Sequence, residues 1–596
     1  MKTINSVNFK YSASLMGLTL CLSSAIPSTL SASQLTFSTS SGHHASCNDL
    51  NGFSISPGAI GLPTKGAVVV SASLVAASGS GPTALGEYCS VTGEIRPVSN
   101  SAPKIRFQAN LPTGWNGKAM MFGGGGFDGE LVFVNFLHAA ASNQISPQGH
   151  GYAVYGGDSG HVQNDTYIFG RDGSFATNDE ALANYASDSL KKTHDAVMNV
   201  INRFYGHGPS RSYFGGGSMG GREALMVAQK WPQDFDGVIA IYPVVSATGW
   251  FLQMGRVSQA MAMPGGYLSD EKRKLVLQLG MNACDGLDGV VDGLISNTQA
   301  CNAMFKMGAN GVLPPALAAA RCPGGGDTGP HCLSDAQIYF LDTFNSALNL
   351  NSPLSSGAKG YPGFNVWGAD LGIISDKPEL FLSLVLGLNL VSPAQPVAPD
   401  QPDVAVFSDQ WWKYFVTRNS NFNSLMQSPS SLGPWQGRVN DLSLMLDASD
   451  QLAAFHARGG KMLIMHGSAD ILVSTRATEQ YYDSLVARLG KNRVRDFVRF
   501  YETPGYGHSV SLSFLAGWDA MSALENWVEN GHKPHHQIVE DKLAIPGRTR
   551  PLCEYPAWPA YKGNGDVNQA SSFKCVKSGD ADDQNDEHEN EESEDD

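Results

Sequence analysis

The chain has 596 residues, with 42% hydrophobic residues, 16% charged residues and a formal net charge of −15. This composition is typical of a globular protein, and the lack of a basic balance argues against a nucleic-acid-binding protein. The length predicts one large domain with a sizeable insertion or a second domain.

Residues 1–33 are expected to form a cleaved secretory signal. Lysines precede the apolar run "LMGLTLCLSSAI", and small residues follow it. The run is too short for a stable transmembrane helix, and no later run is long enough to cross a bilayer. We therefore expect a secreted or periplasmic protein without a membrane span.

Eight cysteines follow the signal, which itself contains Cys21. An even number of cysteines in an exported protein predicts four disulfides, and pairing of sequential neighbours is the simplest of many arrangements. The cysteines expected to form them are Cys47, Cys89, Cys284, Cys301, Cys322, Cys332, Cys553 and Cys575.

A glycine-rich loop, Gly123 to Gly126, follows the strand-like segment "KAMMF". Backbone N–H groups in such a loop can stabilise the oxyanion that develops during acyl transfer. We expect Gly125 to supply this donor, with Gly124 as the next candidate. A purely structural turn is the alternative.

The stretch "YFGGGSMGGREALMVAQKWP" places a serine between a strand and a helix. "SYFGG" is typical of a buried strand, helical spacing follows, and "DGVIAIYPVV" is a second strand. This βαβ unit predicts a parallel α/β sheet. Gly216 to Gly220 match the G-x-S-x-G pattern of a nucleophile elbow. Ser218 is therefore the expected nucleophile, and the Met219 N–H an oxyanion donor.

Residues 247–450 are expected to form an inserted lid domain, because a parallel crossover needs only about a dozen residues. Within it, "FSDQWWKYFVTRNSNF" contains Trp411 and Trp412, which form either the aromatic wall of a substrate pocket or plain lid core. Arg418 is a candidate ligand for a substrate carboxylate, although a surface role is favoured.

The lid also contains the segment "CDGLDGVVDGLISNTQAC", with Asp285, Asp288 and Asp292 close together. Carboxylates, with the carbonyls of Val290 and Leu294, are hard oxygen ligands that suit Ca²⁺. The spacing differs from an EF-hand and lacks its closing glutamate. We expect a structural calcium ion in a loop clamped by the flanking disulfide, with a solvated acidic loop as the alternative.

Two later strands end in loops that carry Asp470 and His508. "GGKMLIMHGSAD" is a strand with an acidic loop, and "VRDFVRFYETPGYGHS" is a strand with a histidine loop. The order serine, aspartate, histidine is that of an α/β-hydrolase triad, in which Asp470 orients His508 as the base. His466 is expected to line the pocket or to have a structural role.

Together these motifs resemble the tannase and feruloyl esterase family, which includes bacterial mono(hydroxyethyl) terephthalate hydrolases. The resemblance covers the mature chain to about Cys575 and rests on "WNGKAMMFGGGGFDG", "GYAVYGGDSGH", the serine motif, the aspartate-rich loop and "GYGH". It implies an α/β-hydrolase core and hydrolysis of aromatic acid esters by Ser218, Asp470 and His508. The calcium ligands that it implies are Asp285, Asp288, Val290, Asp292 and Leu294.

One pair of positions departs from the family pattern. The family has a cysteine before the nucleophile and another after the histidine, joined in a disulfide that braces the triad. Here these positions are Gly217 and Ser509. We expect packing to replace this brace.

The predicted fold is thus an α/β-hydrolase core, residues 34–246 and 451–577, with the lid at 247–450 and a disordered acidic tail at 578–596. The predicted function is a secreted serine esterase for small-molecule esters of phenolic or terephthalic-type acids. A carboxylesterase or lipase with aliphatic substrates, or a noncatalytic binding protein on the same scaffold, is the alternative. Neither the preferred acyl group nor the oligomeric state follows from the sequence.

Overall fold

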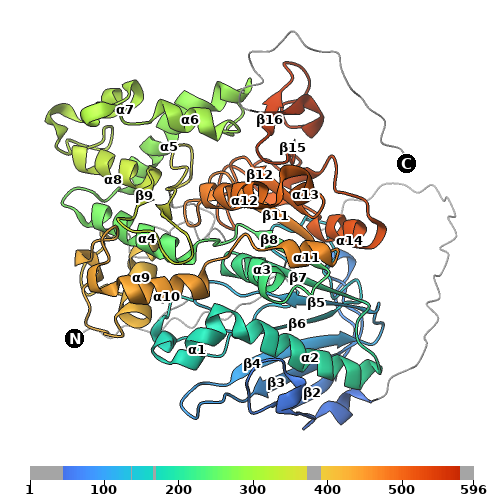
Figure 1. The fold of residues 1–596 in the computed structure, drawn as a ribbon. Coiled ribbons are helices and arrows are strands. Elements are labelled where there is room, and N and C mark those ends of the chain that lie inside the picture. Colours follow the sequence, from blue (N-terminus) through green and yellow to red (C-terminus); the bar gives the residue numbers. More distant parts are fainter. Residues whose placement is uncertain (1–44, 136, 165–169, 372–390, 578–596) are drawn as a thin grey trace, which may run out of the picture. The chain divides into compact units, whose positions relative to one another are not determined.

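A ten-stranded mixed sheet is the centre of the fold in the computed structural model, which describes residues 45–135, 137–164, 170–371 and 391–577 (Figure 1). The expected signal and acidic tail lie outside the described residues. The strands of this sheet are β1 (Ser54–Ile55), β2 (Ala67–Val75), β3 (Tyr88–Ile95), β4 (Ile105–Pro112), β5 (Lys118–Phe122), β6 (Ala153–Gly157), β7 (Arg211–Gly217), β8 (Gly237–Ile241), β11 (Lys461–Gly467) and β12 (Val498–Thr503).

The strand order is β1-β2-β3-β4-β6-β5-β7-β8-β11-β12. The first four strands pair antiparallel with one another, and β4 pairs antiparallel with β6. From β6 to β12 the neighbouring strands are parallel. The carboxyl ends of these parallel strands therefore meet at one edge, where α/β folds bind their ligands.

Helices cover both faces of the sheet. Met121 and Phe214 belong to a core shared with α2, α3 and α12, whereas Met120 and Tyr213 belong to a core shared with α14. Because side chains alternate along a strand, this division shows that the parallel strands are buried on both faces. The flanking helices are α1 (Asp179–Ala183), α2 (Ser189–Tyr205), α3 (Met219–Lys230), α11 (Ala453–Ala457), α12 (Thr475–Leu489), α13 (Lys491–Arg495) and α14 (Ala520–Asn530).

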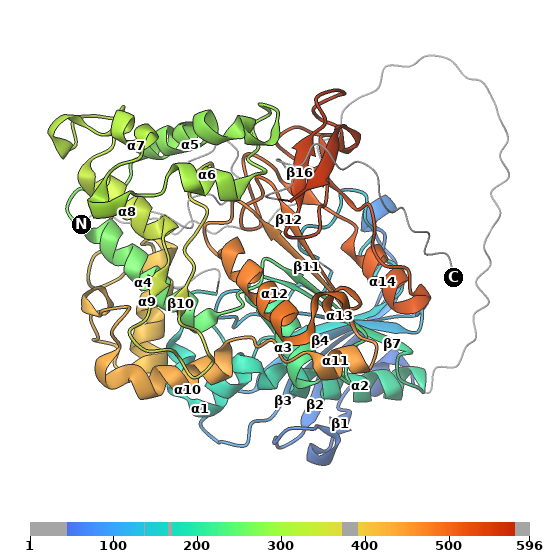
Figure 2. The same ribbon diagram turned by 45° about the horizontal axis from the view of Figure 1, so that its top comes forward.

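Between β8 and β11 most of the described elements are helices, and α4 to α10 group to one side of the sheet (Figures 1 and 2). The described residues belong to one compact unit, so the expected boundary between core and lid stays a prediction. The elements are α4 (Ala247–Ala262), α5 (Asp270–Cys284), α6 (Thr298–Met304), α7 (Pro315–Ala320), α8 (Asp335–Asn345), β9 (Leu348–Asn349), β10 (Gly360–Tyr361), α9 (Asp403–Gln410) and α10 (Gln436–Leu446).

The C-terminal part adds two small sheets and a disulfide. The strands are β13 (Ala516–Gly517), β14 (Ile538–Asp541), β15 (Thr549–Pro551), β16 (Trp558–Tyr561) and β17 (Phe573–Val576). Disulfides join sequential cysteines, as predicted, and the pairs are Cys47–Cys89, Cys284–Cys301, Cys322–Cys332 and Cys553–Cys575. None of the helices in the described ranges has both the length and the apolar character that a membrane span requires.

Candidate active site

Ser218 occupies a sharp turn between β7 and α3. Its φ of 61° lies in the left-handed region that residues other than glycine rarely adopt. A Cβ on Gly216 would lie 2.4 Å from the Gly220 carbonyl oxygen, and a Cβ on Gly220 would lie 2.6 Å from that of Gly124. Glycine is therefore required at both positions, and the tight turn presents the serine hydroxyl at the end of the strand.

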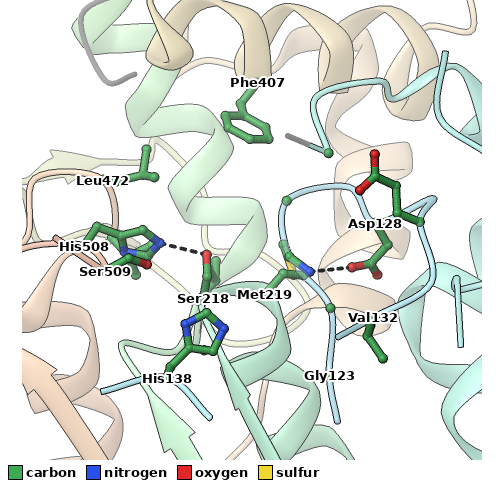
Figure 3. A pocket seen from close by; sticks show the side chains of 18 of the residues that line it. Gly123, Asp128, Val132, His138, Ser218, Met219, Phe407, Leu472, His508 and Ser509 are labelled. Atoms are coloured by element: carbon green, nitrogen blue, oxygen red, sulfur yellow. Dashed lines mark hydrogen bonds between the residues drawn. The ribbon is translucent and has the colours of Figure 1, made fainter. Parts of the chain in front are cut away.

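The loops after β11 and β12 bring Asp470 and His508 to Ser218. His508 Nε2 lies 3.0 Å from Ser218 Oγ (Figure 3), and His508 Nδ1 lies 2.7 Å from Asp470 Oδ2. Burial raises the pKa of Asp470, but the adjacent His508 and His466 more than offset burial and hold this pKa well below its usual range. Asp470 is thus a carboxylate that orients His508, and His508 is placed to accept the serine proton.

His466 contacts Asp470 but does not line the cavity beside Ser218. Its ring is buried, with one nitrogen 2.9 Å from Thr478 Oγ1 and the other 3.1 Å from the Val473 carbonyl oxygen. The second nitrogen also lies 3.3 Å from Asp470 Oδ2. Of the two roles expected for His466, the structure favours the structural one.

The glycine loop after β5 approaches the elbow, but its N–H groups are engaged. Gly125 N–H donates to Asp128 Oδ1 (2.8 Å), and Gly124 N–H donates to Glu223 Oε2 (2.9 Å). The N–H group of the expected oxyanion donor, Gly125, therefore points toward the Asp128 carboxylate, three residues further along the chain. By contrast, the Met219 N–H at the start of α3 donates to no residue that the structure describes.

Asp128 and Glu223 form a buried acid pair behind this loop. Burial raises the pKa of Asp128 to about 6. Burial, together with the charge of Asp128, raises the pKa of Glu223 well above its usual value. Ser159 Oγ donates to the other Asp128 oxygen at 2.8 Å. Two carboxyl groups in contact in a dry site favour a shared proton, so the pair holds the loop as a singly charged unit.

Tyr242 connects two loops of the site, and no sequence motif predicted this connection. It follows β8 with a φ of 37°, and its ring centroid lies 4.5 Å from that of His508. Tyr242 Oη lies 2.5 Å from His138 Nδ1 and 3.0 Å from Ser509 Oγ. Ser509 directly follows His508 and also has a positive φ, 67°. The phenol therefore joins the histidine loop to the segment that carries His138.

The His138 ring occupies the space beside Gly217, below Ser218 in Figure 3. A Cβ on Gly217 would lie 2.6 Å from His138 Cγ and 2.8 Å from Tyr242 Cε2. Burial, with a smaller contribution from His508, lowers the pKa of His138 to about 4, so the ring is neutral near pH 7. Side-chain packing thus fills the place where the resemblance implied a disulfide.

A cavity of about 440 Å³ opens beside Ser218 and His508. The glycine loop forms one wall, and side chains from α4, α9 and the loop after β11 form the others. Figure 3 shows Phe407 and Leu472 on the side of Ser218 opposite His138. The apolar lining from these elements consists of Trp250, Phe251, Phe407, Leu472 and Val473. A planar acyl group therefore has apolar surface on several sides.

The two tryptophans of the expected aromatic wall do not line the cavity. Trp411 and Trp412 are buried behind the cavity lining, where Trp411 stacks on Phe251. Arg418 forms an ion pair with Asp179 and does not reach the cavity either. Of the two roles expected for the tryptophans, the structure favours lid core, and Phe407 of the same segment is the aromatic residue that lines the cavity.

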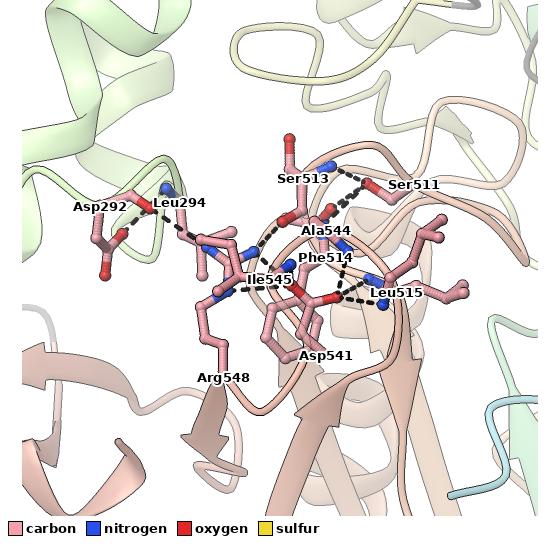
Figure 4. A network of polar contacts seen from close by, with 12 residues as sticks. Asp292, Leu294, Ser511, Ser513, Phe514, Leu515, Asp541, Ala544, Ile545 and Arg548 are labelled. Atoms are coloured by element: carbon pink, nitrogen blue, oxygen red, sulfur yellow. Dashed lines mark hydrogen bonds and ion pairs between the residues drawn. The ribbon is translucent and has the colours of Figure 1, made fainter. Parts of the chain in front are cut away.

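The aspartate-rich loop after α5 is held by the C-terminal segment (Figure 4). Asp285 Oδ1 accepts the N–H groups of Asp292 and Gly293 at 3.0 and 3.1 Å. Arg550 forms an ion pair with the Asp292 side chain, and Arg548 Nη1 donates to the Asp292 carbonyl at 3.3 Å. The loop is therefore ordered by its own turns and by two arginines.

The donor set of this loop fits calcium at Asp288. Its Oδ2 is buried without a hydrogen-bond partner in the described part of the chain. Burial, with the charges of Asp292 and Asp285 adding, raises the pKa of Asp288 to about 6. A divalent cation would satisfy the oxygen and reverse this repulsion. The fit is weaker at Asp292, because Arg550 already compensates its charge.

A tighter cluster of ligand atoms occurs at His194, Asp195 and Asp234, which lie within 4.8 Å of one another. Lys191 Nζ lies 2.9 Å from a carboxylate oxygen of each aspartate. An ammonium group thus already compensates part of the charge of the two carboxylates.

Comparison with known proteins places these features in context. Residues 89–576 match the family model described as "Tannase and feruloyl esterase". An uncharacterized esterase of Agrobacterium fabrum is 35% identical over 539 residues, which cover 89% of this chain and 93% of that protein. The mono(2-hydroxyethyl) terephthalate hydrolase of Piscinibacter sakaiensis is 28% identical over 83% of this chain and 85% of that protein.

Solved structures support the same fold. The crystal structure of feruloyl esterase B from Aspergillus oryzae has a TM-score of 0.68 at 21% identity and covers 86% of this chain and 97% of that one. Tannin acyl hydrolase from Aspergillus niger has a TM-score of 0.61 at 18% identity and covers 86% and 92%. With the mixed central sheet, these similarities confirm the predicted α/β-hydrolase fold.

Proposed function

The chain belongs to the tannase and feruloyl esterase family of ester hydrolases, and on this premise we propose that it is a serine esterase that cleaves esters of aromatic acids. The hydrogen-bonded chain from Ser218 through His508 to Asp470, at the wall of an apolar cavity, is the observation that carries the proposal. Relatives named for terephthalate and feruloyl esters support an aromatic acyl group.

In the proposed reaction, His508 Nε2 accepts the proton of Ser218 Oγ as this oxygen attacks the ester carbonyl carbon. Asp470 stabilises the imidazolium, and the Met219 N–H stabilises the oxyanion. Collapse of the tetrahedral intermediate releases the alcohol, which takes the proton from His508 and leaves an acylated serine. Water, deprotonated by His508, then releases the acid. A second oxyanion donor at Gly125 requires its N–H to turn away from Asp128.

We propose that residues 247–450 act as a lid that shapes the acyl cavity, because Trp250, Phe251 and Phe407 come from this segment. The disulfides support export to an oxidising compartment, secreted or periplasmic.

A structural Ca²⁺ in the aspartate-rich loop is also proposed. The unpartnered Asp288 oxygen supports it, and the ion would neutralise the carboxylates of the loop. Its proposed ligands are Asp285, Asp288, Val290, Asp292 and Leu294.

Initial rates of wild type and Ser218→Ala test the proposal on methyl ferulate, methyl gallate, mono(hydroxyethyl) terephthalate and 4-nitrophenyl acetate. Loss of the nucleophile should lower kcat by about 10⁴-fold or more on every ester that the wild type cleaves. Ser212→Ala, on β7 but outside the cavity, is the matched control and should keep wild-type rates.

Each contrary result points to a named alternative. Activity retained by Ser218→Ala would exclude the serine mechanism. Turnover restricted to aliphatic esters would favour a carboxylesterase or lipase. A folded wild type that cleaves no ester would favour a binding protein on the same scaffold.

A further inference from the structure

Asp403 places a carboxylate in the wall of the acyl cavity that the proposed reaction does not use. It is the first residue of α9, and its side chain is 5% exposed. Oδ1 accepts a hydrogen bond from Arg171 Nη1 at 2.7 Å. None of the described residues donates a hydrogen bond to Oδ2. This oxygen nevertheless keeps some accessible surface, because it is not among the fully buried polar atoms that lack a partner. The remaining accessible surface therefore opens on the cavity that Asp403 lines.

The charged side chains of the cavity are all acidic. Asp403, Asp128 and the exposed Glu130 line it, and no lysine or arginine is among the described lining residues. Arg171, the partner of Asp403, is 1% exposed and lies outside the lining. A substrate anion in this cavity would meet carboxylates without a facing cation. A neutral hydrogen-bond donor would instead find an open acceptor at Asp403.

The helix geometry pairs this acceptor with an aromatic surface. Asp403 and Phe407 are four residues apart on α9, so their side chains lie one above the other on the same face. Trp250 and Phe251, from α4, add further aromatic surface. An aromatic ring packed here can direct a ring substituent toward Asp403.

We propose that Asp403 Oδ2 accepts a hydrogen bond from a phenolic hydroxyl of the acyl group, and that Asp403 thereby selects phenolic acid esters against esters that carry a second, free carboxylate. This inference rests on the proposed esterase function and narrows its substrate class. Burial raises the pKa of Asp403 to about 7, although Arg171 opposes the shift. The carboxylate form therefore predominates at pH 8.5, and a distal substrate carboxylate would be repelled.

Values of kcat/KM at pH 8.5 for three esters test the assignment. Methyl ferulate carries the phenol, methyl 3,4-dimethoxycinnamate replaces it by a methyl ether, and monomethyl terephthalate carries a carboxylate. The wild type should prefer the phenol over its ether by about tenfold or more, since a hydrogen bond to a charged acceptor is lost with the ether. Asp403→Asn should bring this ratio close to one.

The same variant should raise the rate on monomethyl terephthalate relative to methyl ferulate. The asparagine oxygen would stay on Arg171, so its NH₂ group would face the cavity and convert an acceptor into a donor. A general loosening of the site would lower both rates together, so opposite changes identify the hydrogen bond itself. Asp335→Asn, which makes the same change in an exposed carboxylate paired with Arg321 outside the cavity, is the control and should keep the wild-type ratios.

Turnover of 4-nitrophenyl acetate, whose acyl group is too short to reach the distal wall, reports whether the triad is assembled. If the wild type cleaves 4-nitrophenyl acetate but has equal kcat/KM values for methyl ferulate and methyl 3,4-dimethoxycinnamate, the role of Asp403 is overturned. This result does not depend on whether Asp403→Asn folds. Equal losses on the phenol and ether in Asp403→Asn would also overturn this role. Wild type that cleaves none of the esters would contradict the esterase proposal instead.

Discussion

Tyr242 contacts the proposed catalytic histidine both by its ring and through Ser509, the next residue. Ser218, Tyr242 and Ser509 all have positive φ angles, which are strained for residues other than glycine. Such strain persists only where surrounding contacts hold the backbone in place. The two hydrogen bonds of the Tyr242 phenol, to His138 and Ser509, supply part of that restraint.

Tyr242→Phe should lower kcat by about tenfold with little change in KM, because it removes both hydrogen bonds but keeps the ring against His508. Tyr155→Phe is the matched control, since Tyr155 Oη makes a similar bond, 2.7 Å, to His194 Nδ1 outside the cavity. Steady-state kinetics with thermal unfolding of both variants separate positioning from stability. Similar kcat values for the two variants would show that the Tyr242 network has no positioning role.

The acid pair behind the glycine loop should make stability depend on pH. A carboxyl group whose pKa is higher in the folded state binds more protons there than in the unfolded chain. The free energy of unfolding therefore falls as pH rises from about 4 through the raised pKa, which is about 6 for Asp128.

Glu223→Gln should reduce this fall, because its amide can still accept the Gly124 N–H and can donate to Asp128. The free energy of unfolding of the variant minus that of the wild type should therefore be larger at pH 8 than at pH 5. The increase should be on the order of 1 kcal/mol. Thermal unfolding between pH 5 and 8 measures the effect, with Glu94→Gln at the surface of β3 as the control. Parallel pH profiles for wild type and Glu223→Gln would rule out the shared proton.

The residues of the proposed triad were predictable because each belongs to a local pattern, a glycine turn or the end of a strand. His138, Tyr242 and Asp403 carry no such pattern, since their partners lie 104, 267 and 232 residues away along the chain. Sequence spacing cannot reveal contacts of this kind.

At the scale of elements, the aspartate-rich loop packs against the segment that leads to His508. A Cβ on Gly505 would lie 2.6 Å from Leu294 Cδ2, so the Leu294 side chain packs directly against the Gly505 backbone. Asp541 accepts backbone N–H groups from Leu515 and from the turn after β14, and Arg548 joins it at 2.7 Å (Figure 4). The conformation of the aspartate-rich loop therefore helps to position the loop that carries His508.

Removal of calcium with EGTA should lower Tm, and added Ca²⁺, but not Mg²⁺, should restore it. An ion at 100 times its Kd would stabilise the fold by about 2.7 kcal/mol. Asp288→Asn should abolish this response, because it removes the buried oxygen that lacks another partner. Asp195→Asn, in the cluster that pairs with Lys191, should retain this response. A wild-type Tm that does not change with EGTA or Ca²⁺ would exclude the site.

At the scale of the whole molecule, most strands of the parallel half of the sheet were predicted, β6 excepted, and those of the antiparallel half were not. The segments "SYFGG", "DGVIAIYPVV" and "KMLIMHG" are buried on both faces, so their continuous apolar character marks them as strands. Strands β2 and β3 have one partly exposed face and mixed composition, which gives a weaker pattern. The local patterns predicted an α/β sheet and the residue order of an α/β-hydrolase, and the family resemblance implied the same fold.

The order of the chain separates the residues proposed to cleave the ester from those proposed to recognise the acid. Ser218 precedes the segment from α4 to α10 and the other triad residues follow it, whereas Asp403 and Phe407 lie within it. Strands β8 and β11, which flank this segment in sequence, are hydrogen-bonded neighbours in the sheet. Mutation or recombination within the segment can therefore change which acid is accepted while the strands of the triad stay intact. Substrate preference is thus free to diverge among descendants of this protein faster than the chemistry that it serves.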